Sequence, residues 1–452
     1  MSSMIVGKRL LCAASLIALF AAPPALAGMT AQEAARLGKD LTPVGADASG
    51  NKAGTIPAWT GGMTKPPPGY DRASGEFVNP FANEQPLYTI TGANADQYKD
   101  KLAPGQIALL KRYPTYKMRV YPSHRTAAQS ASVYETIKME GQKAELAEGG
   151  NGVLNVHATP VPFPVPKSGV EVIWNHIMYN RGATFIRYST EFPVHTNGSF
   201  TPLKRTEWRA VASALDGAEP NRLSYYRNVT TAPSSIAGEA TLVHEPLDQA
   251  KEPRLAWTYN PGQRRVLRAP SVAHDSPGTG TDGLRTVDDY DGFNGSPERF
   301  DWKLVGKKEM LIGYNNYKLN DKGLKYKDII KETGIDQDLV RYELHRVWHV
   351  QATLKPGARH VYSRRDFYVS EDTWQIAHKD AYDGRGELWR VHEFQLMHDY
   401  DRLLPDYAAN VLYDLQSRRY LVHRLLNEER PSEYNVPMKL SQFTPDALRR
   451  GN

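Results

Sequence analysis

Residues 341–399 alternate apolar and polar side chains through successive segments, and this stretch limits the possible folds more than any other. Between residues 342 and 354 the even positions are mostly apolar and the odd positions mostly polar. This is the two-residue period of a strand with one buried face. Turns follow at Pro356-Gly357 and Asp383-Gly384, where proline presets φ and glycine permits positive φ. The stretch predicts an antiparallel β-meander whose buried face needs an apolar cover from protein or ligand.

More strands are predicted before this meander. They are residues 184–194 and 200–210, joined across Asn197-Gly198, then 222–230 and 240–245, and a hairpin of 255–259 with 264–269. Flat sheets of ten or more strands curl or split. We therefore expect a mainly β protein with helices (α+β), built on a large curved antiparallel sheet or incomplete β-barrel.

One helix is predicted with particular clarity after a proline-rich approach at residues 160–166. Ser168 and Glu171 have the spacing of a capping box, in which each side chain accepts a hydrogen bond from the other residue's backbone amide. Val170, Ile173, Trp174 and Ile177 then form one apolar stripe. This helix is expected to lie across the sheet as a lid.

The first 27 residues have the features of a secretory signal peptide. Lys8 and Arg9 precede an apolar run at residues 10–22, and Ala25-Leu26-Ala27 fits a cleavage site before Gly28. The run is short for a membrane span. We expect an exported, periplasmic protein, with the periphery of the outer membrane as a further location. Residues 28–150 are predicted to form an irregular arm with short helices that wraps a main domain of residues 151–452.

Composition excludes several classes of protein. The single cysteine, Cys12, lies in the predicted signal peptide, so disulfides and thiolate chemistry are excluded from the mature chain. The formal charge is +6, or about +4 without Lys8 and Arg9, which is mild for this length. Together with export, this argues against nucleic acid as a partner. The pairs Arg264-Arg265, Arg364-Arg365 and Arg418-Arg419 are interpreted as solvated strand faces, with anionic lipid head groups as the minority alternative.

The search for catalytic or metal-binding patterns yields no motif. His345 and His349 would lie about 13 Å apart along a strand, too far to share an ion, and are interpreted as surface histidines. Asp288, Asp289 and Asp291 lack the spacing of a calcium loop and are interpreted as part of a solvated loop. His176 is interpreted as a hydrogen-bonded histidine at a helix end. We expect no enzyme, no cofactor and no metal, although carboxylate pairs from distant strands leave no local pattern.

Three separated blocks resemble a bacterial family of exported proteins that is known only as a domain of unknown function. The blocks contain Pro162-Phe163-Pro164 with Glu171 and Trp174-Asn175-His176, residues 300–310 (Phe300 to Met310), and residues 359–365 (Arg359 to Arg365). At residues 257–261 and at Asp383-Gly384 the chain is also similar to the LolA/LolB lipoprotein carriers.

This second resemblance implies an incomplete antiparallel barrel, a helical lid and an apolar cavity for acyl chains. The family's frequent encoding beside resistance-nodulation-division exporters implies lipid or hydrophobic-compound traffic. An inner-membrane exporter and an outer-membrane protein are then the expected protein partners. No catalytic residue is carried over from the family. The absence of a lipoprotein cysteine would make this chain more similar to the soluble LolA type.

Together, these observations predict a periplasmic carrier or chaperone for a lipid, a lipoprotein acyl chain or another long apolar molecule. Exposing a 16-carbon chain to water costs roughly 13 kcal/mol, at about 0.8 kcal/mol per methylene. The expected lining residues are Trp174, Trp257, Tyr259, Leu344, Trp348, Val350 and Phe367. Any one of them is equally consistent with an ordinary core position. The alternatives are a ligand-free structural adaptor between an exporter and an outer-membrane protein, and an exported hydrolase.

Overall fold

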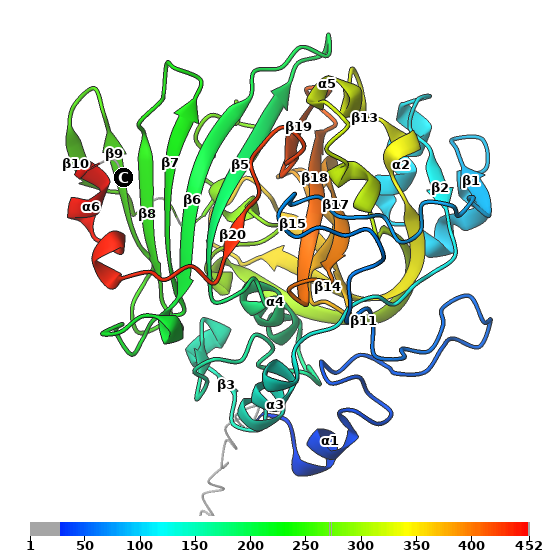
Figure 1. Ribbon diagram of the computed structural model, residues 1–452, viewed down its shortest axis with the longest axis horizontal. Coiled ribbons are helices and arrows are strands. Elements are labelled where there is room, and N and C mark those ends of the chain that lie inside the picture. Colours follow the sequence, from blue (N-terminus) through cyan, green and yellow to red (C-terminus); the bar gives the residue numbers. More distant parts are fainter. Residues whose placement is uncertain (1–27, 271, 273, 451–452) are drawn as a thin grey trace, which may run out of the picture.

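A single large sheet dominates the computed structural model, which describes residues 28–270, 272 and 274–450. The predicted signal peptide and Cys12 lie outside these residues. Within the described chain, 16 strands join in one curved sheet that does not close into a barrel (Figure 1). Nearly all of its pairings are antiparallel, and the helices are few. The predicted fold class, mainly β with a large curved antiparallel sheet, is confirmed.

The predicted meander lies in one half of the sheet. It comprises β14 (Tyr342–Leu354), β15 (Arg364–Ser370), β16 (Ile376–Tyr382) and β17 (Leu388–Asp399). Strands β18 (Leu404–Asp414) and β19 (Arg419–His423) follow it in the same half. Strand β11 (Phe300–Gly313) pairs with β14 through a bulge between Leu304 and Gly306. It also lies against β16 and β17, which shows that this part of the sheet curls on itself. We call β11 and β14–β18 the curled half.

The remaining long strands extend from β19 as a second half, which we call the wing. They are β5 (Thr184–Val194), β6 (Leu203–Val211), β7 (Ser224–Ala232), β8 (Ala240–Glu245), β9 (Leu255–Asn260) and β10 (Arg265–Arg268), in that order. Figure 1 shows these strands side by side, with α6 (Pro445–Arg450) against the outer end. On that face Tyr225 and Leu242 pack against Phe443 and Leu448. The opposite face of the wing is therefore available to bound the cavity described below.

Seven short strands and five further α-helices accompany the long strands in the described chain. The strands are β1 (Tyr88–Ile90), β2 (Met118–Val120), β3 (Glu145–Leu146), β4 (Val153–Leu154), β12 (Ile330–Lys331), β13 (Gly334–Ile335) and β20 (Glu433–Tyr434). The helices are α1 (Ala31–Arg36), α2 (Pro104–Arg112), α3 (Ala131–Glu140), α4 (Gly169–Met178) and α5 (Tyr326–Ile329). None of the helices in the described chain combines the length and apolar character needed to cross a membrane.

The N-terminal region packs against the curled half and adds strands to it. Strand β2 pairs with β1 and bridges to Tyr342 of β14. In α2, the Gly105 amide donates to Asp380 at 2.9 Å and Gln106 Nε2 donates to the Leu311 carbonyl at 3.0 Å. Residues 28–150 therefore share the sheet and core of the following region. The division at residue 150 stays a prediction.

Strand β14 is buried on both faces over its first half, so the expectation of a solvated outer face is wrong there. Glu343 and His345 occupy the predicted polar face, yet both are almost fully buried. The His124 amide and the Asn315 side chain donate to the Glu343 carboxylate, at 2.8 and 3.0 Å. Segments distant in sequence supply these partners, and the period of the strand alone does not reveal them.

Helix α4 lies against β11 and β14, as its apolar stripe predicts. Gly169 permits the close approach, because a Cβ there would lie 2.9 Å from the Lys303 carbonyl carbon. Both bonds of the predicted capping box are present: Ser168 Oγ accepts from the Glu171 amide and Glu171 accepts from the Ser168 amide. This cap confirms the helix start that the sequence indicates.

Replacing Ser168 with alanine should destabilise the protein by about 1 kcal/mol, because the Glu171 amide loses its acceptor. The free energy of unfolding in urea measures the effect. Ser441→Ala, at an exposed position in the short helix Leu440–Phe443, is the control and should change stability by less than about 0.5 kcal/mol. Equal effects of the two substitutions would show that the cap does not stabilise α4.

Candidate ligand-binding cavity

A cavity of about 400 Å³ lies between the wing and a long connecting segment. We call residues 274–294 of this segment the wall. Strands β5–β9 supply one side of the cavity, the wall supplies the other, and Ile177 and Arg181 border it from the end of α4. The helix predicted as a lid thus contributes to the cavity through its C-terminal end.

The lining mixes apolar and charged side chains, whereas the resemblance to the lipoprotein carriers implies an apolar cavity. Apolar and aromatic contacts come from Ile177, Phe185, Leu223, Tyr226, Val243, Val287, Tyr290 and Phe293. The charged residues are Arg181, Arg187, Arg205, Arg209, Arg254 and Arg285, against Glu239, Glu245 and Asp291. The lining therefore contains twice as many arginines as carboxylates. On β5 and β6 these arginines alternate with residues of the other face, which made them look solvent-exposed in the sequence.

Most of these arginines are neutralised by buried carboxylates. Arg205 and Arg285 share Glu191 of β5, which is fully buried. Burial alone would raise the pKa of Glu191, but the two guanidinium groups lower it to about 2. Arg254 pairs with Glu245 at 2.5 Å. Glu191 therefore stays ionised and fixes two arginines at one end of the cavity.

At the other end of the cavity, the Asp291 carboxylate of the wall lies near two arginines. Its carboxylate lies 3.5 Å from Arg181 and 3.8 Å from Arg424. Burial alone would raise the pKa of Asp291, but the arginines around it hold that pKa well below the usual value. Arg187 lies 3.9 Å from Glu207, and its Nε is buried without a hydrogen-bond partner among the described residues.

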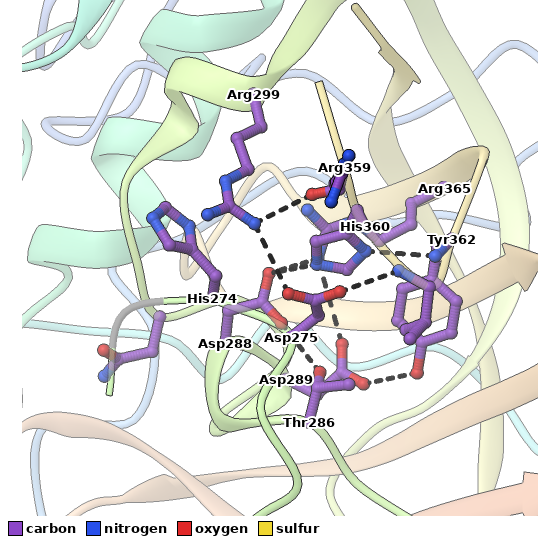
Figure 2. A network of polar contacts seen from close by, with 12 residues as sticks. His274, Asp275, Thr286, Asp288, Asp289, Arg299, Arg359, His360, Tyr362 and Arg365 are labelled. Atoms are coloured by element: carbon purple, nitrogen blue, oxygen red, sulfur yellow. Dashed lines mark hydrogen bonds and ion pairs between the residues drawn. The ribbon is translucent and has the colours of Figure 1, made fainter. Parts of the chain in front are cut away.

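The wall is fixed to the curled half by a network of buried charges (Figure 2). His360 and Arg365 contact Asp288 at 3.1 and 2.8 Å, and Tyr362 donates to Asp289 at 2.7 Å. The short helix Val287–Asp289 turns Asp288 and Asp289 towards this network, whereas Val287 and Tyr290 line the cavity. Residues 287–290 therefore contribute both to the buried charge network and to the cavity lining.

Lys379 of β16 completes the attachment. Its Nζ lies 2.5 Å from Asp289 and 2.8 Å from the Gly292 carbonyl, and both charged side chains are fully buried. Burial lowers the pKa of Lys379 to about 8, which leaves it mainly protonated at pH 7. Burial would raise the pKa of Asp289, but Lys379, His392 and Arg365 hold it far below its ordinary value. The pair is ionised at neutral pH.

Two sequence interpretations are corrected by this network. Asp288, Asp289 and Asp291 are buried, not part of a solvated loop, because cations from β15, β16 and the end of α4 surround them. Arg365 of the Arg364-Arg365 pair is also fully buried, whereas Arg364 is half-buried. Arg365 lies 77 residues from Asp288 in the sequence, and Lys379 lies 90 residues from Asp289, so a local pattern does not reveal these pairs.

The histidine predictions have mixed outcomes. His176 is a hydrogen-bonded helix histidine, as predicted: Nδ1 accepts from the Ile376 amide and Nε2 donates to the Asp291 carbonyl. His345 is buried against Glu343 and Tyr314, so its interpretation as a surface residue is wrong. His349 is partly exposed and lies 3.0 Å from Asp366. Within the described residues, no three His, Cys, Asp or Glu side chains are grouped to hold a metal ion.

Of the seven residues predicted to line a ligand site, Tyr259 borders the cavity and also packs in the cluster on the α6 face of the wing. The other six lie elsewhere: Trp174 packs with Phe163, Trp257 on the α6 face of the wing, and Leu344, Trp348, Val350 and Phe367 in the curled half. Contact of these residues with a ligand stays a prediction. The cavity residues were missed because Arg187, Arg205 and Arg209 look like a solvated strand face.

Fold and cavity together define a mainly β protein with an arginine-rich cavity between the wing and the wall. Residues 89–449 match the family described as "Protein of unknown function (DUF1329)", and the chain belongs to this family. The match confirms the family resemblance found in the sequence. The chain is 52% identical over 431 residues to Uncharacterized protein PA3922 of Pseudomonas aeruginosa, with 94% of each chain covered.

Among solved structures, the chain is similar to a putative outer membrane lipoprotein-sorting protein domain from Vibrio parahaemolyticus. The identity is 11%, the TM-score is 0.44, and 62% of this chain and 98% of that chain are covered. The chain is also similar to a DUF1329 family protein from Desulfovibrio piger, at 14% identity and a TM-score of 0.42. The similarity covers 60% of this chain and 92% of that chain. A third similar structure is the LolA superfamily protein NE2245 from Nitrosomonas europaea, at 11% identity and a TM-score of 0.38. The similarity covers 62% of this chain and 100% of that chain. These likenesses are too distant to assign a ligand.

The Glu191 ion pairs should make stability depend on pH. The folded pKa of about 2 lies below the ordinary 4.5, so the stabilisation is complete above about pH 4.5 and is lost as pH falls towards 2. A shift of this size corresponds to about 3 kcal/mol. We expect the difference in unfolding free energy between wild type and Glu191→Gln to shrink as urea titrations move from pH 5 to pH 3. Glu332→Gln, at an exposed site, should show no such trend.

The Asp289–Lys379 pair should behave as a coupled unit. Asp289→Asn leaves the Lys379 ammonium buried without its counter-ion and should cost roughly 3–5 kcal/mol. Adding Lys379→Met should recover part of that loss, with a coupling energy above about 1 kcal/mol in a double-mutant cycle. Additive effects of the two substitutions in urea unfolding would contradict the arrangement.

Proposed function

We propose that this protein is a carrier in the periplasm that binds a lipid or another amphiphilic small molecule in the cavity between the wing and the wall. The observation that carries this proposal is the cavity itself. Its volume of about 400 Å³ falls within the range of roughly 300–1,000 Å³ that is usual for small-molecule sites. Its lining combines apolar side chains, which suit a ligand tail, with nine charged side chains, which suit a charged group of the ligand.

The apolar residues of the lining give a ligand tail its binding energy. Phe185, Val243 and Phe293 come from β5, β8 and the wall, so a tail would contact both sides of the cavity. Each methylene removed from water contributes about 0.8 kcal/mol, so eight methylenes contribute roughly 6 kcal/mol before the costs of association. An affinity useful for transport is therefore available without a large apolar tunnel.

A binding role is proposed in preference to catalysis because of the chemistry of the charged lining. Six of its nine charged residues are arginines, which stay protonated at neutral pH and neither donate nor accept protons readily. Three of the carboxylates at or beside the cavity, Glu191, Glu245 and Asp291, are held in ion pairs. These groups suit the positioning of a ligand better than general acid–base chemistry.

One observation favours the adaptor alternative. The interior of the curled half is filled by its own side chains, including Val350, Phe367 and Trp374, which leave the predicted guest site occupied by protein. Such a solid half would suit docking to an exporter or to an outer-membrane protein. The cavity at the wing favours a carrier, and the two roles are separated by whether the native protein holds a ligand.

Native mass spectrometry of protein purified from periplasm should reveal a bound mass that organic extraction removes. Val243→Trp fills the cavity from β8 and should reduce ligand recovery at least several-fold, because the indole occupies the space of a tail. The control is Val305→Trp at an exposed position of β11, which should retain the ligand. A folded Val243→Trp protein with wild-type ligand content would overturn the site, and ligand-free wild type would favour the adaptor.

A further inference from the structure

One arginine of the cavity has no counter-ion. Arg209, on β6, has no hydrogen bond, ion pair or ring contact with any of the residues described by the structure, whereas the other five lining arginines each lie within 3.9 Å of a carboxylate. Arg209 nevertheless borders the cavity. Arg209 is partly buried, and a partly buried cation without a partner is less stable than a paired one, so this position favours an anion.

The surroundings of Arg209 strengthen this requirement. Arg181 and Arg187 are near enough that their charges, after burial itself, lower its pKa to about 9, which leaves Arg209 protonated at pH 7. Asp291 is the carboxylate whose charge raises the pKa of Arg209, and it already faces Arg181 and Arg424. The end of the cavity around Arg209 therefore has more positive charge than its own carboxylates neutralise.

Apolar surface lies directly beside this cation. In the register of the sheet, Arg209 is opposite Phe185 on β5 and Tyr226 on β7, and Tyr226 is opposite Val243 on β8. All four side chains line the cavity. One row across the wing thus presents a guanidinium between two aromatic rings, with an aliphatic side chain beyond. This is the arrangement that a molecule with a charged head and an apolar tail would contact along its length.

We propose that Arg209 binds the anionic head group, a carboxylate or a phosphate, of a single-chain amphiphile whose tail lies along Tyr226 and Val243. Guanidinium groups bind both head groups through paired N–H···O bonds. This inference rests on the proposed carrier function and specifies the class of ligand. Arg181 and Arg187 add positive charge around the head, and Arg209 is the group that contacts it.

Four probes test the proposal: dodecanoate and dodecyl phosphate, each below its critical micelle concentration, dodecanol below its solubility limit, and inorganic phosphate. Titration calorimetry on the wild-type protein, stripped of native ligand, should give at least tenfold tighter binding of dodecanoate or dodecyl phosphate than of dodecanol. A tenfold ratio corresponds to about 1.4 kcal/mol. Arg209→Met should remove this preference while leaving dodecanol affinity within about twofold, and Arg209→Lys should retain part of it.

The matched control is Arg265→Met, which removes an exposed arginine from β10 and should change none of the affinities. Equal binding of dodecanoate and dodecanol to wild type would overturn the head-group assignment and leave the carrier function standing. Inorganic phosphate binding as tightly as dodecyl phosphate would overturn the role of the tail. Failure of every alkyl probe, with no ligand on the native protein, would overturn the carrier function itself. The wild-type comparisons do not depend on the folding of any variant.

Discussion

The buried ion pair between Asp289 and Lys379 is the interaction on which the cavity depends. It joins the wall to β16, and the neighbouring contacts of Asp288 with His360 and Arg365 attach the same turn to β15 and to the loop before it. A wall held only by apolar contacts would tend to collapse onto the apolar residues of the wing. Directional charge pairs in a low-dielectric interior instead fix its distance from the sheet. The polar contacts on the side of the wall that faces away from the wing therefore maintain the cavity.

Much of the fold could be predicted because its signals are local. The alternation in β14, the Asp383-Gly384 turn before β17 and the capping box of α4 each depend on residues within one element or one turn. The hairpins of β5 with β6 and of β9 with β10 follow from Asn-Gly and Pro-Gly turns in the same way. These features determine strand order along the meander and the wing.

The candidate cavity could not be predicted from the sequence, because the search looked for aromatic and branched side chains and many of the lining residues are charged. Aromatic and branched side chains such as Val350 and Phe367 were expected to face a guest, but these residues fill the curled half. The polar face of β6, with Arg205, Glu207 and Arg209, resembles a solvated strand, and only the distant wall covers it. Recognising this from sequence would require knowing that Glu191, Arg205 and Arg285 meet, although up to 94 residues separate them. The signal in the sequence that could have indicated this cavity is the high arginine content of the wing strands.

The last strand of the wing has a consequence for how copies of the protein meet. A sheet this long ends in a strand whose outward amides and carbonyls invite pairing with another chain, a known route to aggregation. Here that strand, β10, has four residues, with arginine at both ends. Two such edges would bring like charges together before backbone pairing could begin. The β10 edge is therefore a poor template for pairing between copies of the protein.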